Sequence, residues 1–155
     1  MNKYFLRKAR ISDVKPIHGL LMSYSKQELL LPRSYSELYS HLRDYYIIAE
    51  NDGPAVLGCC ALSIVWENLA EIRSLAIAPE LKSRGWGRKL VDSCLSEAIT
   101  LGIYKVFTLT YQKEFFKKMD FVEITKDVLP QKVWADCLRC PKFPDCDETA
   151  MLMEM

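Results

Sequence analysis

The residues best suited to chemistry in this sequence lie between Ala70 and Leu90, which reads AEIRSLAIAPELKSRGWGRKL. A strand-like run ends at Pro79, and a basic loop with Gly85 and Gly87 then leads into an amphipathic helix. Glycines permit tight turns and close approach to an anion, and a helix start offers free N–H groups at the positive end of its dipole. The spacing matches neither the Walker loop nor the dinucleotide fingerprint. The segment therefore predicts a site for another ligand with a phosphate-bearing tail.

With its preceding strand, this loop resembles the acyl-CoA-binding motif of the GNAT acetyltransferases, [QR]-x-x-G-x-[GA]. The loop here is KSRGWG, and Lys82 departs from the usual first residue. Because the family uses the loop chiefly through main-chain amides, that departure changes little. The resemblance implies acetyl-CoA as co-substrate, held at the pantetheine arm and the diphosphate by Leu75, Ala76, Ile77, Lys82, Arg84, Gly85, Trp86, Gly87, Arg88 and Lys89. The alternative reading is an ordinary helix entry with a solvated basic turn.

Hydrophobic periodicity and turn residues place this loop within a series of strands and helices. Ser12 and Asp13 predict the N-cap of a first helix, and Ser34 with Glu37 has the capping-box pattern of a second. The predicted strands are 4–8, 45–50, 55–66, 71–78, 104–110, 121–124 and, less regularly, 150–153, and the helices are about 13–25, 36–44, 87–101 and 114–119. This is the GNAT element order, so we expect an α/β fold whose mixed, mostly antiparallel sheet is flanked by helices and splayed between strands 4 and 5.

Length and composition limit the remaining possibilities. The 155 residues suit one domain, and we expect a single acetyltransferase domain over residues 1–155. Half of the residues are hydrophobic and the net charge is +1, which argues against a nucleic-acid partner. Apolar stretches are too short for a membrane span, and the N-terminus lacks the apolar core of a signal peptide. We therefore expect a cytoplasmic protein without a membrane partner.

Three further segments narrow the resemblance to a subgroup of the family. LLLPRS at 29–34, TLTYQKEFFKKMDF at 108–121 and LPQKVWADCLRCPKFPDCDE at 129–148 together resemble the short, kinase-free N-acetylglutamate synthases of bacterial arginine biosynthesis. The resemblance implies direct transfer of acetyl from acetyl-CoA to the α-amine of L-glutamate. The alternatives are another amino acid, a polyamine or a protein N-terminus as acceptor, or a non-catalytic module that senses acyl-CoA. The sequence leaves open whether the protein forms a homodimer.

Glu71 is the candidate general base, because an amine nucleophile is mostly ammonium at neutral pH and must lose a proton before it attacks a thioester. An exposed strand carboxylate is the alternative reading. Where many family members carry a tyrosine acid in the pattern fYxxxGF, this chain has Phe116. Thr110, at the end of a strand, is the candidate hydroxyl, although such a group more often satisfies local backbone.

Three arginines are candidates for binding the two carboxylates of glutamate, since a guanidinium presents a planar fork of donors. Arg7 and Arg33 match positions that the synthases use for glutamate, and Arg73 lies two residues beyond Glu71 on the same predicted strand face. The alternative for Arg7 and Arg73 is a surface charge whose aliphatic stem covers the sheet, and for Arg33 a helix-entry residue.

The cysteine-containing segment at about 128–148 lies outside this chemistry. Cys137, Cys140 and Cys146 have a C-x2-C-x5-C spacing that suits zinc or an iron–sulfur centre, but no fourth ligand is evident, so we expect no metal. A redox-sensitive disulfide or packed thiols are the alternatives. Cys59 and Cys60 fall in a predicted strand, where one of the two should face the core.

Overall fold

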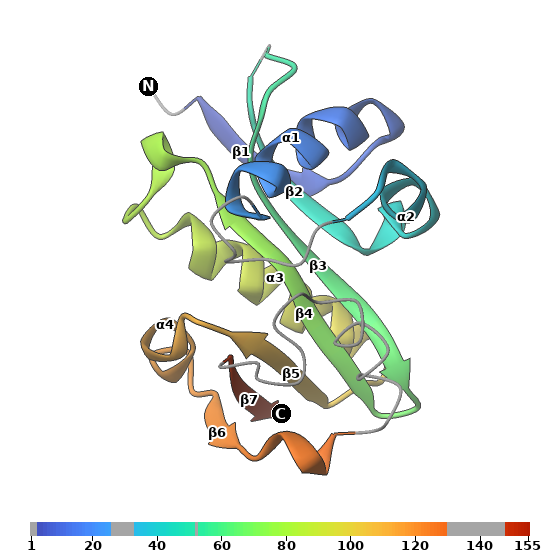
Figure 1. Cartoon of the computed structure of the whole chain (residues 1–155), viewed down its shortest axis with the longest axis vertical. Coiled ribbons are helices and arrows are strands. Elements are labelled where there is room, and N and C mark those ends of the chain that lie inside the picture. Colours follow the sequence, from blue (N-terminus) through green and yellow to red (C-terminus); the bar gives the residue numbers. More distant parts are fainter. Residues whose placement is uncertain (1–2, 26–32, 52, 130–147) are drawn as a thin grey trace. The chain divides into compact units, whose positions relative to one another are not determined.

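The computed structural model describes residues 3–25, 33–51, 53–129 and 148–155 (Figure 1). The strands are β1 (Tyr4–Lys8), β2 (Tyr45–Glu50), β3 (Val56–Trp66), β4 (Leu69–Ile77), β5 (Lys105–Thr110), β6 (Val122–Ile124) and β7 (Thr149–Glu154). The helices are α1 (Val14–Ser25), α2 (Tyr35–Ser40), α3 (Trp86–Thr100) and α4 (Lys113–Lys117), with short 3-10 turns at Ile11–Asp13, Leu42–Asp44, Pro79–Leu81 and Lys126–Val128. The predicted element order is confirmed.

The strands form one mixed sheet in the order β1-β2-β3-β4-β5-β7-β6. β1 and β2 pair antiparallel, as do β2 and β3, β5 and β7, and β6 and β7. β4 and β5 pair in parallel, at Ala70 with Val106 and at Glu71 with Phe107. The predicted mixed, mostly antiparallel sheet is therefore confirmed.

The chain divides into two compact units, and the first contains Met1–Leu62 and Ile72–Glu97. Apolar residues of α1, α2, β2, β3 and β4 form one core there, including Ile17, Leu38, Ile47 and Ala76. The neighbouring β3 residues Cys59 and Cys60 are both fully buried, so the expectation that only one would face a core was wrong. Cys59 belongs to this core, whereas the Cys60 Sγ lies 3.6 Å from the Cys94 Sγ on α3. Because successive strand residues point to opposite faces, helices cover both faces of β3.

The second unit contains Ser63–Glu71 and Ala98–Met155. Its own core includes Phe107 on β5, Ala150 on β7 and Leu129, with Val65 and Leu69 of the β3–β4 hairpin packed against them. The Asn68 side chain at the hairpin turn accepts a hydrogen bond from the Tyr104 N–H at 2.8 Å, which ties the turn to the start of β5. The single domain expected over residues 1–155 stays a prediction.

The two helix starts that the sequence predicted have different outcomes. At α2 the capping box is present: the Ser34 hydroxyl accepts from the Glu37 N–H, and the Glu37 side chain accepts from the Ser34 N–H. At the first helix the predicted N-cap at Ser12 and Asp13 was wrong, because Arg10 is the cap residue of a 3-10 turn that precedes α1. The Asp13 carboxylate instead accepts from the Arg10 N–H at 2.7 Å.

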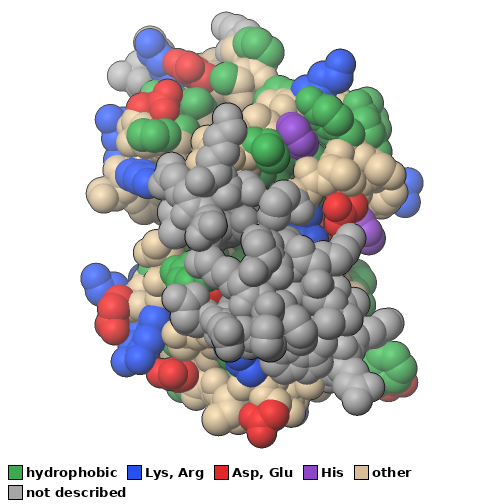
Figure 2. Space-filling view, in the orientation of Figure 1, with side chains coloured by type: hydrophobic (Ala, Val, Ile, Leu, Met, Phe, Trp, Pro, Cys, Tyr) green, Lys and Arg blue, Asp and Glu red, His purple; other side chains and the backbone are tan. Residues whose placement is uncertain are grey.

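Charged side chains of both signs are interspersed over the described part of the face in Figure 2, in keeping with a net charge of +1. Among the described helices, none has both the length and the hydropathy that crossing a bilayer requires.

Candidate active site

The loop between β4 and α3 has the backbone shape that its glycines predicted. Ser83 and Gly85 both have positive φ angles, of 64° and 83°. A Cβ at Gly85 would meet no heavy atom within 4 Å, so the left-handed φ, rather than crowding, favours glycine there. The first turn of α3 closes on this residue, with the Lys89 N–H donating to the Gly85 carbonyl at 3.2 Å. The loop therefore leads directly into a helix start, where N–H groups point outward and favour an anion.

Aromatic residues anchor both sides of this loop. Trp86 is buried and packs edge-on against Tyr4, with ring centroids 6.3 Å apart. The ammonium group of Lys89 lies 4.3 Å from the centre of the Trp86 ring, and that of Lys82 lies 5.4 Å from the centre of the Tyr24 ring. Because the Trp86 side chain points into the protein, only its main chain is available to a ligand of the loop.

Of the remaining loop residues, Arg84 and Arg88 are exposed and Gly87 is partly exposed. The two arginines, with Lys82 and Lys89, surround the start of α3 with positive charge. This charge adds to the dipole of the helix N-terminus in attracting an anion.

β4 contains a kink that the sequence did not predict. Ser74 has a φ of 56°, a left-handed conformation that a non-glycine residue in a strand rarely adopts. The Tyr45 hydroxyl lies 3.2 Å from the Ser74 hydroxyl, and the Cys59 thiol donates to the Ser74 carbonyl at 3.2 Å. Leu75, Ala76 and Ile77, the predicted partners of the pantetheine arm, follow directly after the kink. The Ile77 carbonyl accepts a hydrogen bond from the Tyr24 hydroxyl.

Both side chains that hold the kink stay protonated at neutral pH. Burial raises the pKa of Tyr45 to about 12, against the smaller lowering effects of its hydrogen bond to Ser74 and of the charges of Arg33 and Arg73. Burial likewise raises the pKa of Cys59 to about 12, although a hydrogen bond from the Ala76 N–H works in the other direction. A thiol in this state is a hydrogen-bond donor and a poor nucleophile.

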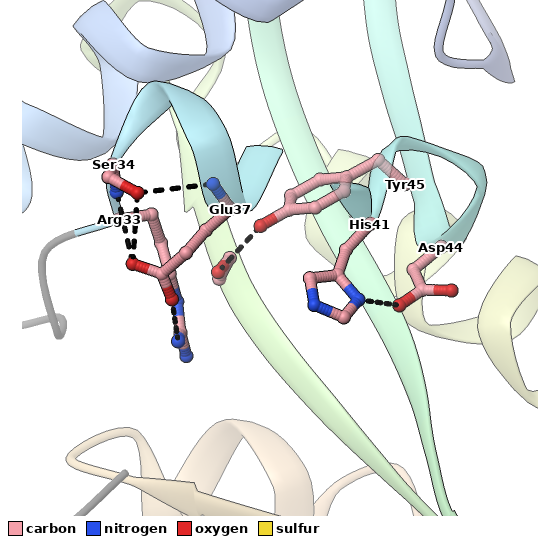
Figure 3. Close-up of polar contacts among 7 residues, drawn as sticks. Arg33, Ser34, Glu37, His41, Asp44 and Tyr45 are labelled. Atoms are coloured by element: carbon pink, nitrogen blue, oxygen red, sulfur yellow. Dashed lines mark hydrogen bonds and ion pairs between the residues drawn. The ribbon is translucent and has the colours of Figure 1, made fainter. Parts of the chain in front are cut away.

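Arg33 and Arg73 come within electrostatic reach of the same tyrosine, since the charge of each lowers the pKa of Tyr45. Arg33 forms an ion pair with Glu37 at 3.5 Å, and its side chain is only 11% exposed (Figure 3). Arg73 is partly buried on β4, and its Nε and Nη2 atoms are shielded from solvent. Two of the three predicted substrate arginines thus lie in the first unit within electrostatic range of Tyr45, a residue that the sequence did not single out.

Asp44 belongs to the same neighbourhood. Burial raises its pKa, and the charges of His41, Lys8 and Arg73 partly offset that effect. The His41 Nδ1 lies 3.8 Å from the Asp44 carboxylate (Figure 3). Acidic side chains therefore balance the two arginines, so that the local charge is not uniformly positive.

Arg7, the third predicted arginine, has a well-defined protein partner. Its guanidinium donates to both oxygens of Asp13, at 2.7 and 3.1 Å, and also to the Lys8 carbonyl at 3.0 Å. The Asp13 side chain is only 5% exposed. Although its burial works against ionisation, the hydrogen bonds from Arg7 and from the Arg10 N–H hold the pKa of Asp13 below its ordinary value. The role of Arg7 in substrate binding stays a prediction.

The predicted proton-transfer residues lie in the second unit. Glu71 is partly exposed on β4, opposite Phe107 of β5. Thr110 is buried at the end of β5, and its hydroxyl accepts a hydrogen bond from the Gln112 N–H at 2.8 Å. This contact leaves the hydroxyl proton available for donation.

Phe116 stands where the family pattern has a tyrosine. It is buried in α4, with ring centroids 5.0 Å from Phe115 and 5.1 Å from Phe121. The residue therefore completes an aromatic cluster, and no phenol is present at this position to act as the acid.

The candidate metal ligands Cys137, Cys140 and Cys146 lie outside the described residues. Within the part of the chain that is described, no three His, Cys, Asp or Glu side chains are disposed to hold a metal ion.

Comparison with known proteins identifies the family. The sequence profile of the acetyltransferase (GNAT) family matches residues 14–121, and the chain belongs to this family. An uncharacterized N-acetyltransferase of Chlorobaculum tepidum is 40% identical over 95% of this chain and 94% of its own length. The amino-acid acetyltransferase of Mycobacterium tuberculosis is 33% identical over 86% of this chain and 77% of its own length.

One solved structure has the same fold over the whole chain. It is the N-acetylglutamate synthase of Neisseria gonorrhoeae in complex with coenzyme A and N-acetyl-glutamate, with a TM-score of 0.87 and 24% identity. The alignment covers 99% of this chain and 35% of that protein. The same synthase with coenzyme A and L-arginine aligns with a TM-score of 0.79 and 25% identity, over 100% of this chain and 34% of that protein. This chain thus spans about a third of the length of that synthase.

Proposed function

We propose that this protein is an amino-acid N-acetyltransferase that transfers acetyl from acetyl-CoA to the α-amine of L-glutamate. The observation that carries the choice of acceptor is that Arg33 and Arg73 are both near enough to Tyr45 for their charges to lower its pKa, because two guanidinium groups suit a substrate with two carboxylates. The name of the N. gonorrhoeae protein, N-acetylglutamate synthase, supports the same choice, and the name of the M. tuberculosis protein supports an amino-acid acceptor.

The donor would bind along the first unit. The main chain of Leu75–Ile77 would pair with the pantetheine arm as an added strand does, and amides of 84–89 would hold the diphosphate at the start of α3. The left-handed Gly85 and the surrounding basic side chains support this placement.

The acceptor would be held by Arg33 and Arg73. Because Arg7 already makes a two-pronged contact with Asp13, we assign it a smaller share of carboxylate binding. Holding both carboxylates would restrict the α-amine to an orientation from which it can reach the thioester carbon.

Glu71 would remove a proton from the ammonium group, and the free amine would attack the thioester carbon. Main-chain amides near Leu75 would bear the negative charge that develops on the carbonyl oxygen. As the C–S bond breaks, the nitrogen releases its surplus proton to solvent and the CoA sulfur leaves as a thiolate, which takes up a proton from solvent either directly or relayed through the Thr110 hydroxyl. Transfer is direct in this scheme, which agrees with the high pKa and complete burial of Cys59.

The test is an acceptor screen. CoA thiol release from acetyl-CoA is measured with each of the twenty amino acids, a polyamine and a peptide N-terminus. We expect L-glutamate to give the highest kcat/KM. A higher value with another acceptor would contradict the glutamate assignment while leaving the acetyltransferase assignment intact.

A second candidate is a module that senses acyl-CoA without catalysis, and the buried Phe116 in place of the tyrosine acid favours it. In the same screen, that candidate predicts acetyl-CoA binding by calorimetry with no thiol release for any acceptor.

A further inference from the structure

The kink of β4 at Ser74 is held from two neighbouring strands. On β4 the buried residues Ala70, Ile72 and Ala76 alternate with partly exposed ones, and Ser74 interrupts this pattern. Its φ of 56° rotates the adjoining peptide groups away from the direction that a regular ladder requires. Side chains from β2 and β3 approach Ser74 at this point, and each makes a different hydrogen bond.

The Cys59 thiol on β3 contacts the backbone on both sides of Leu75. Its sulfur lies 3.2 Å from the Ser74 carbonyl oxygen, to which it donates, and it accepts a hydrogen bond from the Ala76 N–H. A buried peptide group that leaves its ladder must find another partner or lose stability. Cys59 provides such a partner for the Ser74 carbonyl.

The Tyr45 hydroxyl on β2 holds the Ser74 side chain at 3.2 Å. Tyr45 is itself 4% exposed and packed in the core of the first unit, so packing fixes the position of its hydroxyl. The side chain and the carbonyl of Ser74 are therefore each tied to a different strand, which holds the kink in one conformation.

We propose that Cys59 and Tyr45 are positioning residues for the acyl donor: they hold the kink at Ser74 so that the main chain of Leu75–Ile77 is aligned to pair with the pantetheine arm. This inference rests on the proposed function, which places that arm along β4. Neither side chain touches the donor, and both act through the backbone of Ser74 and Ala76.

The test compares two ligands that share the diphosphate but differ in the arm. Acetyl-CoA has the pantetheine arm, and adenosine 3′-phosphate 5′-diphosphate ends at the diphosphate. Their dissociation constants are measured by calorimetry for the wild type and for Cys59→Ala, Cys59→Ser and Tyr45→Phe. The matched control is Cys60→Ala, which deletes a buried thiol from the neighbouring residue of the same strand.

We expect Cys59→Ala to weaken acetyl-CoA binding by about threefold to tenfold and Tyr45→Phe by about threefold, as the loss of one or two modest hydrogen bonds would do. Binding of the short ligand should not change. Cys59→Ser should recover part of the affinity, because a hydroxyl keeps both the donor and the acceptor. Cys60→Ala should leave the ratio of the two constants at its wild-type value.

Simple loss of stability would lower the affinity for both ligands together and leave their ratio unchanged, so such a result would overturn the positioning role. If Cys59→Ala and Tyr45→Phe both had the wild-type ratio of the two dissociation constants, the positioning role would likewise be overturned, and the proposed function would be unaffected. If the wild type bound acetyl-CoA no more tightly than the short ligand, the placement of the arm in the proposed function would fail, and the inference would fail with it.

Discussion

Glu71 is the residue on which the proposed chemical step depends. The Glu71→Gln variant keeps the shape of the side chain but cannot accept the proton of an ammonium group. We expect kcat to fall by on the order of 10² to 10⁴, the usual contribution of a general base, while acetyl-CoA affinity is retained. The loss should shrink as pH rises, because free amine then accumulates without the base.

Steady-state rates between neutral and alkaline pH, together with calorimetric affinities, check this prediction. Glu67→Gln in the exposed β3–β4 turn is the matched control, since it removes a carboxylate from the same hairpin. A Glu71→Gln enzyme that turns over at the wild-type rate at neutral pH would exclude Glu71 as the base.

Arg33 is proposed to contribute binding energy rather than chemistry. Arg33→Ala should raise the KM for glutamate by about tenfold to a hundredfold with a smaller change in kcat, because a hydrogen bond to a charged group is lost from the ground state and the transition state alike. Steady-state kinetics with glutamate as the varied substrate measure this. Arg43→Ala, which removes an exposed arginine of the first unit, should leave the KM unchanged. A fall in kcat at constant KM would instead place Arg33 in the chemical step.

At the scale of elements, a glycine beyond the end of α3 provides a control for a substitution in the loop that precedes the helix. Gly85 and Gly102, near its two ends, have φ angles of 83° and 82°, and a Cβ at either would meet no heavy atom within 4 Å. Aspartate at either position therefore imposes similar backbone strain, of about 1 kcal/mol. Only Gly85→Asp also places a negative charge against the proposed diphosphate site.

We expect Gly102→Asp to lose more thermal stability than Gly85→Asp, because a negative charge is unfavourable at a helix C-terminus and favourable at an N-terminus, and Gly85→Asp alone to lose most of its acetyl-CoA affinity. Thermal melts and calorimetry on the two proteins measure the two effects. Equal acetyl-CoA affinity in both variants would show that the loop does not hold the diphosphate.

Elements whose signals are local were predictable from the sequence. β1 and β2 are at their predicted positions, and the capping box of Ser34 and Glu37 starts α2, since each depends on residues within one turn or one strand. The kink at Ser74 was not predictable, because its partners Cys59 and Tyr45 are 15 and 29 residues away in sequence. The sequence placed Asp13 at the N-cap itself, whereas its carboxylate accepts from the N–H of the cap residue Arg10 and also binds Arg7 on β1.

The candidate site also has some features that were predictable from the sequence and others that were not. The shape of the loop before α3 was predictable because two glycines, a helix start and basic residues are consecutive in sequence, whereas its binding of a diphosphate stays a prediction. The nearness of Arg33 and Arg73 to Tyr45 depends on how α2, β2 and β4 pack in the first unit. The sequence matched Arg7 and Arg33 to positions of the synthases and offered Arg73 as a third candidate. The partners that the structure shows, Asp13 for Arg7 and Glu37 for Arg33, were not predicted.

At the scale of the whole molecule, the pair of Arg7 and Asp13 should make stability depend on pH. The folded state holds the pKa of Asp13 below its unfolded value of about 3.9, so the stabilisation is complete above that value and is lost as pH falls through the folded pKa. Asp13→Asn should lower the free energy of unfolding at neutral pH by about 1 to 2 kcal/mol.

Urea unfolding of the wild type and of Asp13→Asn at pH 7 and at about pH 3 checks this prediction. The difference between the two proteins should shrink at the lower pH. Asp127→Asn, at an exposed carboxylate, should have little effect at either pH. A difference that is independent of pH would mean that Asp13 acts through its shape rather than through its charge.

Chemical labelling of the three buried thiols of the first unit should also report the rate at which that unit opens. Cys59, Cys60 and Cys94 are all 0% exposed, and alkylating reagents attack only an accessible thiolate. The rate at which iodoacetamide modifies these three residues, followed by peptide mass spectrometry, should thus measure how often the first unit unfolds under native conditions. Saturating acetyl-CoA should slow that labelling in proportion to the affinity with which it binds the folded form. The native cysteines of the first unit would thereby report ligand binding without any engineered labelling site.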